Sequence, residues 1–148
     1  MKKIEQYRRL LNVPGEVSLT ALKTNYRNLI KEHHPDKFTS DMDAKATAEK
    51  MSQRIIEAYH FLVSIAPETI AASLSQYTQT LEQAAIEDFL YKAETLRIDF
   101  SDGNSYEYFG VPKAIYIKLL NAPSQARFLR RHIAGNFTYR SINRLAAA

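Results

Sequence analysis

A His-Pro-Asp tripeptide at residues 34–36, between two segments with helical apolar spacing, constrains the fold of this chain more than any other feature. The first segment, 19–33, follows Ser18, whose hydroxyl can cap a helix N-terminus. Pro35 disfavours helical backbone at the residue before it, so the first helix should end just ahead of the tripeptide. The second segment covers 44–63. The sequence therefore predicts two antiparallel helices whose connecting loop is exposed at one end.

Each of these helices has one apolar face, because side chains three and four residues apart lie on the same side of a helix. The first face contains Leu19, Leu22, Tyr26, Leu29 and Ile30, and the second contains Ala48, Met51, Ile55, Ala58, Tyr59 and Leu62. Lys23, Arg27 and Lys31, four residues apart, form a separate basic stripe on the first helix. A basic stripe alone usually marks only a solvated face, so its meaning depends on its conjunction with the tripeptide.

These residues resemble the J domain, the co-chaperone module that stimulates ATP hydrolysis by chaperones of the 70-kDa heat-shock class. The segment Tyr7–Val13 fits the family's Tyr-x-x-Leu-x-Val pattern, with Asn12 where glycine is usual. Further matches are Leu22, Lys23, Tyr26, Arg27 and Leu29 before the tripeptide, Lys37 after it, and Glu57, Ala58, Tyr59 and Leu62 in the second helix. The resemblance implies a J domain over residues 1–66, formed by the antiparallel helical hairpin.

The resemblance also implies a chaperone-binding surface. Its residues would be Lys23, Arg27, Lys31, His34, Pro35, Asp36 and Lys37. The chain departs from the family at Asn28 and Glu32, where Arg or Lys is common, and at Ser52, where an aromatic residue or Met is usual.

Charge divides the chain into three parts, which we take as domains. Residues 1–66 have 11 Lys and Arg against 8 Asp and Glu, residues 67–95 have 1 against 5, and residues 96–148 have 8 against 3. The acidic middle part is predicted to be a helical connector that restarts at Pro67, since Pro fits the first turn of a helix. Its apolar residues, Ile70, Leu74, Tyr77, Leu81, Phe89, Leu90 and Ala93, suggest one long helix or two shorter ones, bent near residues 78–80.

The last part changes to the alternating pattern of strands. Strands are predicted at 96–100 and 105–109 around a turn at 101–104, followed by helices at 112–120 and 125–133 and a closing strand from Phe137. This β-β-α-α-β order resembles the KTSC domain, a module of unknown function named for its occurrence at the C-terminus of some lysyl-tRNA synthetases. The matching residues are Tyr106-Glu107-Tyr108, Gly110-Val111-Pro112, Ala122 with Ser124, and Phe137 with Tyr139. The whole chain is therefore predicted to be α+β.

Several function classes are not expected. The chain has no cysteine and only four glycines, and it contains no phosphate-binding loop or nucleophile motif. We therefore expect no enzyme activity, no metal and no cofactor. No apolar run approaches the ~20 residues of a membrane span, and no secretory signal is recognisable, so a cytoplasmic location is expected. The oligomeric state stays open.

Two functional hypotheses follow. In the first, the protein is a J-domain co-chaperone that binds a 70-kDa heat-shock class chaperone and stimulates its ATPase, while the C-terminal module recruits a specific client or RNA. In the second, the basic, Tyr-rich C-terminal module makes it an RNA-binding protein, because Arg contacts phosphate and Tyr stacks on unpaired bases. The RNA-binding candidates are Tyr106, Tyr108, Lys118, Arg127, Arg130, Arg131 and Arg140.

Overall fold

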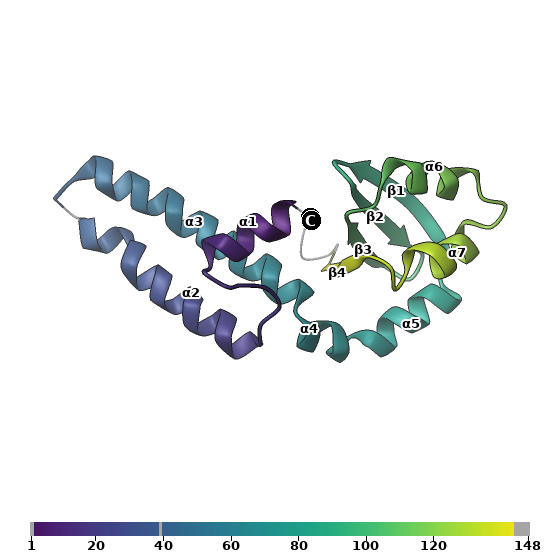
Figure 1. The fold of residues 1–148 in the computed structure, drawn as a ribbon, viewed down its shortest axis with the longest axis horizontal. Coiled ribbons are helices and arrows are strands. Elements are labelled where there is room, and N and C mark those ends of the chain that lie inside the picture. The colour runs from purple at the N-terminus through teal and green to yellow at the C-terminus, as the bar shows by residue number, and fades with distance from the viewer. Residues whose placement is uncertain (1, 39, 144–148) are drawn as a thin grey trace. The chain divides into compact units, whose positions relative to one another are not determined.

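The computed structural model describes residues 2–38 and 40–143. The chain divides into two compact units, residues 1–71 and residues 72–148. Within the described residues the first unit is helical, and the second is built on a four-stranded antiparallel sheet with helices packed against it (Figure 1). The predicted α+β class is confirmed.

The first unit is the predicted helical hairpin with a short preceding helix. Its elements are α1 (Lys2–Leu10), α2 (Leu19–His33), the 3-10 turn η1 (Pro35–Phe38), α3 (Met42–Ile65) and α4 (Pro67–Ala72). Helix α2 has the predicted bounds, and the Ser18 hydroxyl accepts a hydrogen bond from the Ala21 N–H at 3.1 Å. Helix α3 starts two residues earlier than predicted because the Asp41 carboxylate caps it, accepting from the N–H groups of Asp43 and Ala44.

The predicted apolar faces meet in the core of this unit. Leu22 of α2 is buried together with Ile55, Ala58 and Leu62 of α3. Tyr26 stacks on Tyr59 across the hairpin, with ring centroids 4.1 Å apart. Burying a large apolar side chain contributes roughly 1.5–3 kcal/mol, so this layer fixes how the two long helices pair. Their connecting loop is thereby held at one end of the hairpin.

The predicted connector over 67–95 is helical only in part. Helix α4 stops at Ala72, and α5 (Leu74–Gln83) follows after a break at Ser73. The expected bend near residues 78–80 is wrong, since α5 runs through them. The expected helix over Phe89–Ala93 is also wrong, because strand β1 (Ile86–Lys92) occupies most of that segment. The chain divides at 71/72, inside this segment, and the three-part boundaries drawn from charge stay a prediction.

The second unit therefore has one strand more than predicted. After β1 come β2 (Thr95–Phe100), β3 (Asn104–Phe109), α6 (Lys113–Asn121), α7 (Gln125–Phe128), the π-helical segment η2 (Leu129–Ile133) and β4 (Thr138–Asn143). The strand order is β1-β2-β3-β4, and every neighbouring pair is antiparallel. The predicted strands, turn and helices from residue 96 onward are confirmed. The predicted second helix consists of one α-helical turn followed by the π-helical segment.

A layer of aromatic side chains lies between the sheet and its helices. The hydroxyls of Tyr77 on α5 and Tyr108 on β3 share a hydrogen bond of 2.8 Å, and the Tyr77 ring stacks on that of Tyr139 at 4.1 Å. Burial raises the pKa of Tyr77 and of Tyr108 above the ordinary value, so both keep their protons at neutral pH. Helix α5 is thus anchored to the sheet.

Candidate functional site

The His34-Pro35-Asp36 loop presents two polar side chains that face one another. His34 ends α2 with extended backbone, and η1 begins at Pro35. The Asp36 N–H donates to His34 Nδ1 at 3.2 Å, and an Asp36 carboxylate oxygen lies 3.5 Å from the same nitrogen. Because Nδ1 acts as an acceptor here, the neutral ring carries its proton on Nε2. The two side chains are 50% and 85% exposed, so both are available to a partner.

The loop is held by one hydrogen bond from α3 and by one within the loop itself. The Ser52 hydroxyl of α3 donates to the His33 carbonyl at 3.0 Å, and the Lys37 N–H donates to the His34 carbonyl at 3.1 Å. The last carbonyls of a helix lack intrahelical partners, so Ser52 satisfies one that α2 leaves open. The structure therefore gives a role to Ser52, which sequence reasoning recorded only as a departure from the family.

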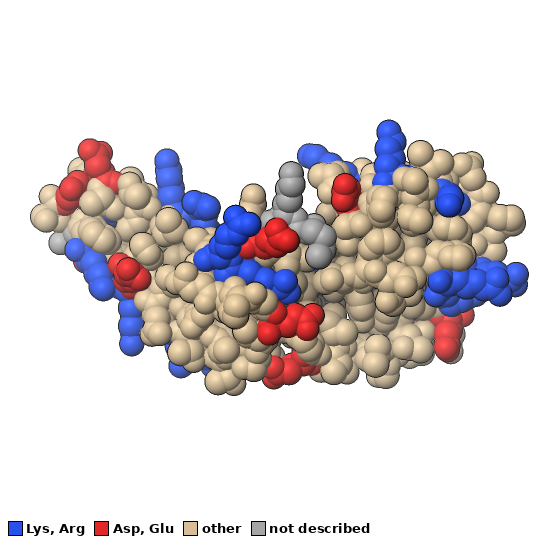
Figure 2. All heavy atoms as spheres, in the orientation of Figure 1, with Lys and Arg blue, Asp and Glu red and all other residues tan. Residues whose placement is uncertain are grey.

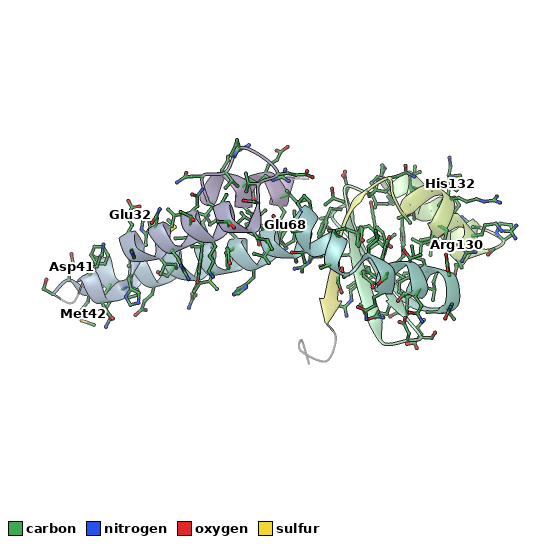
Figure 3. All side chains as sticks on the ribbon, turned by 90° about the horizontal axis from the view of Figure 1, so that it is seen from below. Glu32, Asp41, Met42, Glu68, Arg130 and His132 are labelled. Atoms are coloured by element: carbon green, nitrogen blue, oxygen red, sulfur yellow. The ribbon has the colours of Figure 1, made fainter. Side chains whose placement is uncertain are left out.

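The other side of the loop leads into α3. Asp41 and Met42 lie at the tip of the hairpin (Figure 3), and Met42 is 84% exposed. Sequence analysis had assigned no role to either residue.

The predicted basic stripe is exposed along α2. Lys23, Arg27 and Lys31 all lie on the solvent side of the helix, and Lys37 continues the positive charge beyond the loop. At 1.5 Å per residue, the stripe on α2 is about 12 Å long. Asn28 and Glu32 are also exposed, so they lower the positive charge of the same helix. The structure brings the predicted chaperone-binding residues together around one helix and one loop.

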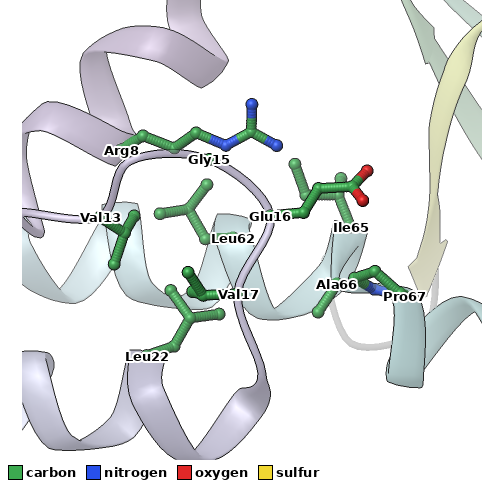
Figure 4. A pocket seen from close by; sticks show the side chains of 10 residues that line it. All are labelled: Arg8, Val13, Gly15, Glu16, Val17, Leu22, Leu62, Ile65, Ala66 and Pro67. Carbon is green, nitrogen blue, oxygen red and sulfur yellow. The ribbon is translucent and has the colours of Figure 1, made fainter.

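The first unit also has a small apolar hollow behind the α1–α2 loop (Figure 4). Val13, Val17, Leu22 and Leu62 line it, with Arg8 among the surrounding side chains. Its volume of ≈ 20 Å³ is enough for about one water molecule. This hollow is therefore too small to be a ligand site.

The RNA-binding candidates of the second unit are not brought together as predicted. Tyr106 and Tyr108 are 2% and 0% exposed, so neither ring can stack on a base, and this prediction is wrong. They are buried because α5, α6 and η2 contribute to the core on the same face of the sheet. Arg140 is half-buried, and its Nε donates to the Glu107 carboxylate at 2.7 Å.

The remaining basic candidates are exposed. Positive side chains gather over the end of the unit that carries α7 (Figure 2), where Arg127, Arg130 and Arg131 are exposed. Arg130 is tied down in part, because its Nη1 donates to the Leu81 carbonyl at 3.0 Å. Lys118 is exposed on α6. These residues form a basic surface without an aromatic stacking platform.

Two further properties bear on function. Among residues 2–38 and 40–143, no group of three or more His, Cys, Asp or Glu side chains is arranged to hold a metal ion. None of the helices in the described part of the chain has both the length and the apolarity to span a bilayer.

A helical hairpin that exposes a His-Pro-Asp loop next to a basic helix defines the J-domain class. The family model of the DnaJ domain matches residues 6–68, and that of the KTSC domain matches residues 83–137. The chain thus carries a DnaJ domain followed by a KTSC domain, as predicted.

Curated proteins named lysine–tRNA ligase are similar to part of this chain. Those of Nostoc punctiforme and Trichormus variabilis are 38% and 34% identical to this chain over 64 residues, which is 42% of the chain and 11% of each relative. That of a further Nostoc strain is 38% identical over 50 residues, or 34% of the chain and 9% of the relative. The chain therefore spans about a tenth of the length of the relatives it matches.

Proposed function

We propose that this protein is a co-chaperone that stimulates ATP hydrolysis by a chaperone of the 70-kDa heat-shock class. A DnaJ domain implies such a partner in general and is not itself an enzyme. The observation that carries the proposal is the exposed loop in which Asp36 and His34 are held together at the end of α2. The backbone N–H of Asp36 orients the His34 ring before any partner arrives, so the imidazole needs little ordering on binding.

The basic stripe provides the first contact in this mechanism. Lys23, Arg27 and Lys31 would meet an acidic surface on the nucleotide-binding domain of the chaperone. Opposite charges speed the encounter and set its orientation more than they add affinity. The stripe leads directly to the tripeptide, so an oriented encounter brings the loop to a defined place on the partner.

The loop provides the regulatory contact. His34 and Asp36 would engage the region that joins the nucleotide and substrate domains of the chaperone. Stimulation requires that the loop bind the hydrolysis-competent state more tightly than the other state, because a ligand shifts an equilibrium only by its differential affinity. The J-domain unit thus changes another protein's rate, and we place this activity in the cytoplasm.

We propose that the KTSC unit recruits a specific client to the chaperone. RNA recruitment is the weaker alternative, because the burial of Tyr106 and Tyr108 leaves only cations such as Arg127 and Arg131 for a nucleic acid. Cations alone would bind RNA through its phosphates, without the contribution of base stacking.

The test is single-turnover ATPase stimulation of a bacterial 70-kDa chaperone by the full chain and by His34→Gln. We expect the parent to stimulate and the variant to lose stimulation, because Gln has no ring to hold against the Asp36 backbone. His60→Gln, at an exposed position on α3, is the matched control and should stimulate like the parent. Equal stimulation by His34→Gln and the parent, at matched concentrations and with unchanged circular dichroism, would contradict the proposal.

A further inference from the structure

A polar hollow lies in the second unit, and none of the basic residues discussed above lines it. Helix α5 and the β2–β3 turn form its walls, and its volume is ≈ 380 Å³, within the size range of small-ligand sites. The side chains that matter are Gln76, Gln79, Thr80, Gln83, Asp102 and Asn104. Apolar side chains usually predominate in ligand sites, so this amide-rich lining calls for a ligand with many hydrogen-bonding groups.

Hydrogen bonds fix the Asp102 carboxylate in this hollow. The hydroxyl of Thr80, which is only 2% exposed, donates to Asp102 Oδ2 at 2.6 Å, and the Asn104 N–H donates to Oδ1 at 3.0 Å. The Asn104 amide donates in turn to the Thr80 oxygen at 3.1 Å. The carboxylate is thus held in one orientation, and Asp102 is exposed, so a further donor can reach it.

The hollow is negatively charged and has no internal counter-charge. Burial alone would raise the pKa of the Asp102 carboxyl, but the hydrogen bonds from Thr80 and Asn104 hold that pKa below its ordinary value. Asp102 is therefore ionised at neutral pH. Of the described residues that line the hollow, none is Lys, Arg or His. A ligand that supplies positive charge would complete the site.

The glutamine side-chain amides of α5 favour one kind of cation, a guanidinium. Gln76, Gln79 and Gln83 follow one another at three- and four-residue spacing, so their side chains lie on one face of α5, beside Asp102. Their amide oxygens are neutral acceptors that can surround a donor already bound to the carboxylate. A guanidinium has five N–H donors in one plane and needs several acceptors at once, whereas a phosphate offers only acceptors and repels a carboxylate.

We propose that this hollow binds the guanidinium group of an arginine side chain in a client protein. Asp102 accepts two of its N–H groups, and the Gln amides accept the others. The inference deepens the proposed client-recruiting role of the KTSC unit, but its test does not involve the chaperone. A failed ATPase assay and a failed binding assay are therefore separate results.

The test is an NMR titration of the ¹⁵N-labelled full chain with a capped Gly-Gly-Arg-Gly-Gly peptide. We expect saturable shifts confined to amides of α5 and the β2–β3 turn. The same peptide with citrulline in place of arginine keeps the shape but loses the charge, and it should not bind. Methylguanidinium alone should bind at the same amides more weakly than the peptide; equal affinity would overturn the assignment to a protein segment in favour of a free guanidinium compound.

Two sets of variants check the residues. Asp102→Asn should weaken peptide binding by about tenfold or more, since it removes a charge-assisted hydrogen bond. Asp88→Asn, at an exposed carboxylate of β1 outside the hollow, should bind like the parent. Gln79→Ala with Gln83→Ala, both on the exposed wall, should also weaken binding without disturbing the Thr80 network. Three results would each overturn the proposal. They are equal binding of the citrulline peptide, unchanged peptide binding by both Asp102→Asn and the Gln79→Ala, Gln83→Ala double variant, and shifts at these amides produced by single-stranded RNA instead of the peptide.

Discussion

Asn12 has a backbone conformation that glycine would adopt more easily. It follows α1 with φ of 56°, in the left-handed region, and its N–H and that of Val13 donate to the Arg9 and Arg8 carbonyls. This is the usual way in which a helix is ended by one left-handed residue, and glycine is preferred there because it has no Cβ. Asn is the next best choice, which explains how the chain departs from the family at Asn12 and keeps the same turn.

We predict that Asn12→Gly stabilises the helical unit and that Asn12→Ala destabilises it, by up to about 1 kcal/mol in each direction. The measurement is urea unfolding followed by far-UV circular dichroism. The Asn25 side chain donates to the carbonyls of Leu11 and Asn12, and neither substitution removes these acceptors. A less stable glycine variant would show that the Asn12 side chain has a contact that outweighs its backbone strain.

Single residues show which structural features a sequence pattern can predict and which it cannot. Ser18 as a helix cap depends on local geometry alone, so it could be predicted. The alternation around Tyr106 and Tyr108 correctly placed both rings on one face of a strand. Which face becomes the core depends on where α5 and α6 pack, and this is set by contacts distant in sequence. That is why two buried tyrosines were mistaken for a binding surface.

At the scale of elements, β1 was the strand that the sequence did not reveal. Its register shifts between Ile86 and Asp88, so the inward-facing residues Ile86, Phe89 and Tyr91 are spaced by three and then by two. A bulge inserts one residue into a strand and breaks strict alternation, and a spacing of three resembles a helix. The hairpin also lacks the Asn-Gly or Asp-Gly signal of a tight turn.

The turn of this hairpin is therefore strained and can be improved. Ala93 and Glu94 have φ of 50° and 62°, and they join the paired residues Lys92 and Thr95. Two left-handed residues between antiparallel strands make a type I′ turn, for which Asn-Gly is preferred.

We predict that replacing Ala93-Glu94 with Asn-Gly raises the free energy of unfolding of the sheet unit by about 1–2 kcal/mol. Hydrogen exchange of the β1 and β2 amides measures the effect, with slower exchange expected. Ala93→Val is the opposing control, because a β-branched side chain is least compatible with positive φ, and it should speed exchange. No change in either variant would mean that the turn does not limit the opening of this hairpin.

For the whole molecule, the distribution of charge matters more than its net value. The chain carries 20 Lys and Arg, 16 Asp and Glu, and a formal charge of only +4. The positive charge that serves the proposed function is local to α2, where Asn28 and Glu32 reduce it.

The domain order and most of the helices could be predicted because each depends on patterns within one segment.

The last prediction concerns how the reduced positive charge of α2 guides the encounter with the chaperone. We expect Arg27→Ala to slow association of the full chain with a bacterial 70-kDa chaperone and Glu32→Lys to speed it, each by about two- to tenfold at low salt. Both effects should shrink as salt shortens the range of electrostatic attraction. Surface-binding kinetics at several salt concentrations give the association rates.

Asn28→Lys should act like Glu32→Lys but more weakly, because it adds one charge where Glu32→Lys changes the charge by two. Glu49→Lys, an exposed reversal on α3 and off the stripe, separates local steering from net charge and should leave association nearly unchanged. If Glu49→Lys speeds association as much as Glu32→Lys, net charge guides the encounter and the stripe has no special part in it.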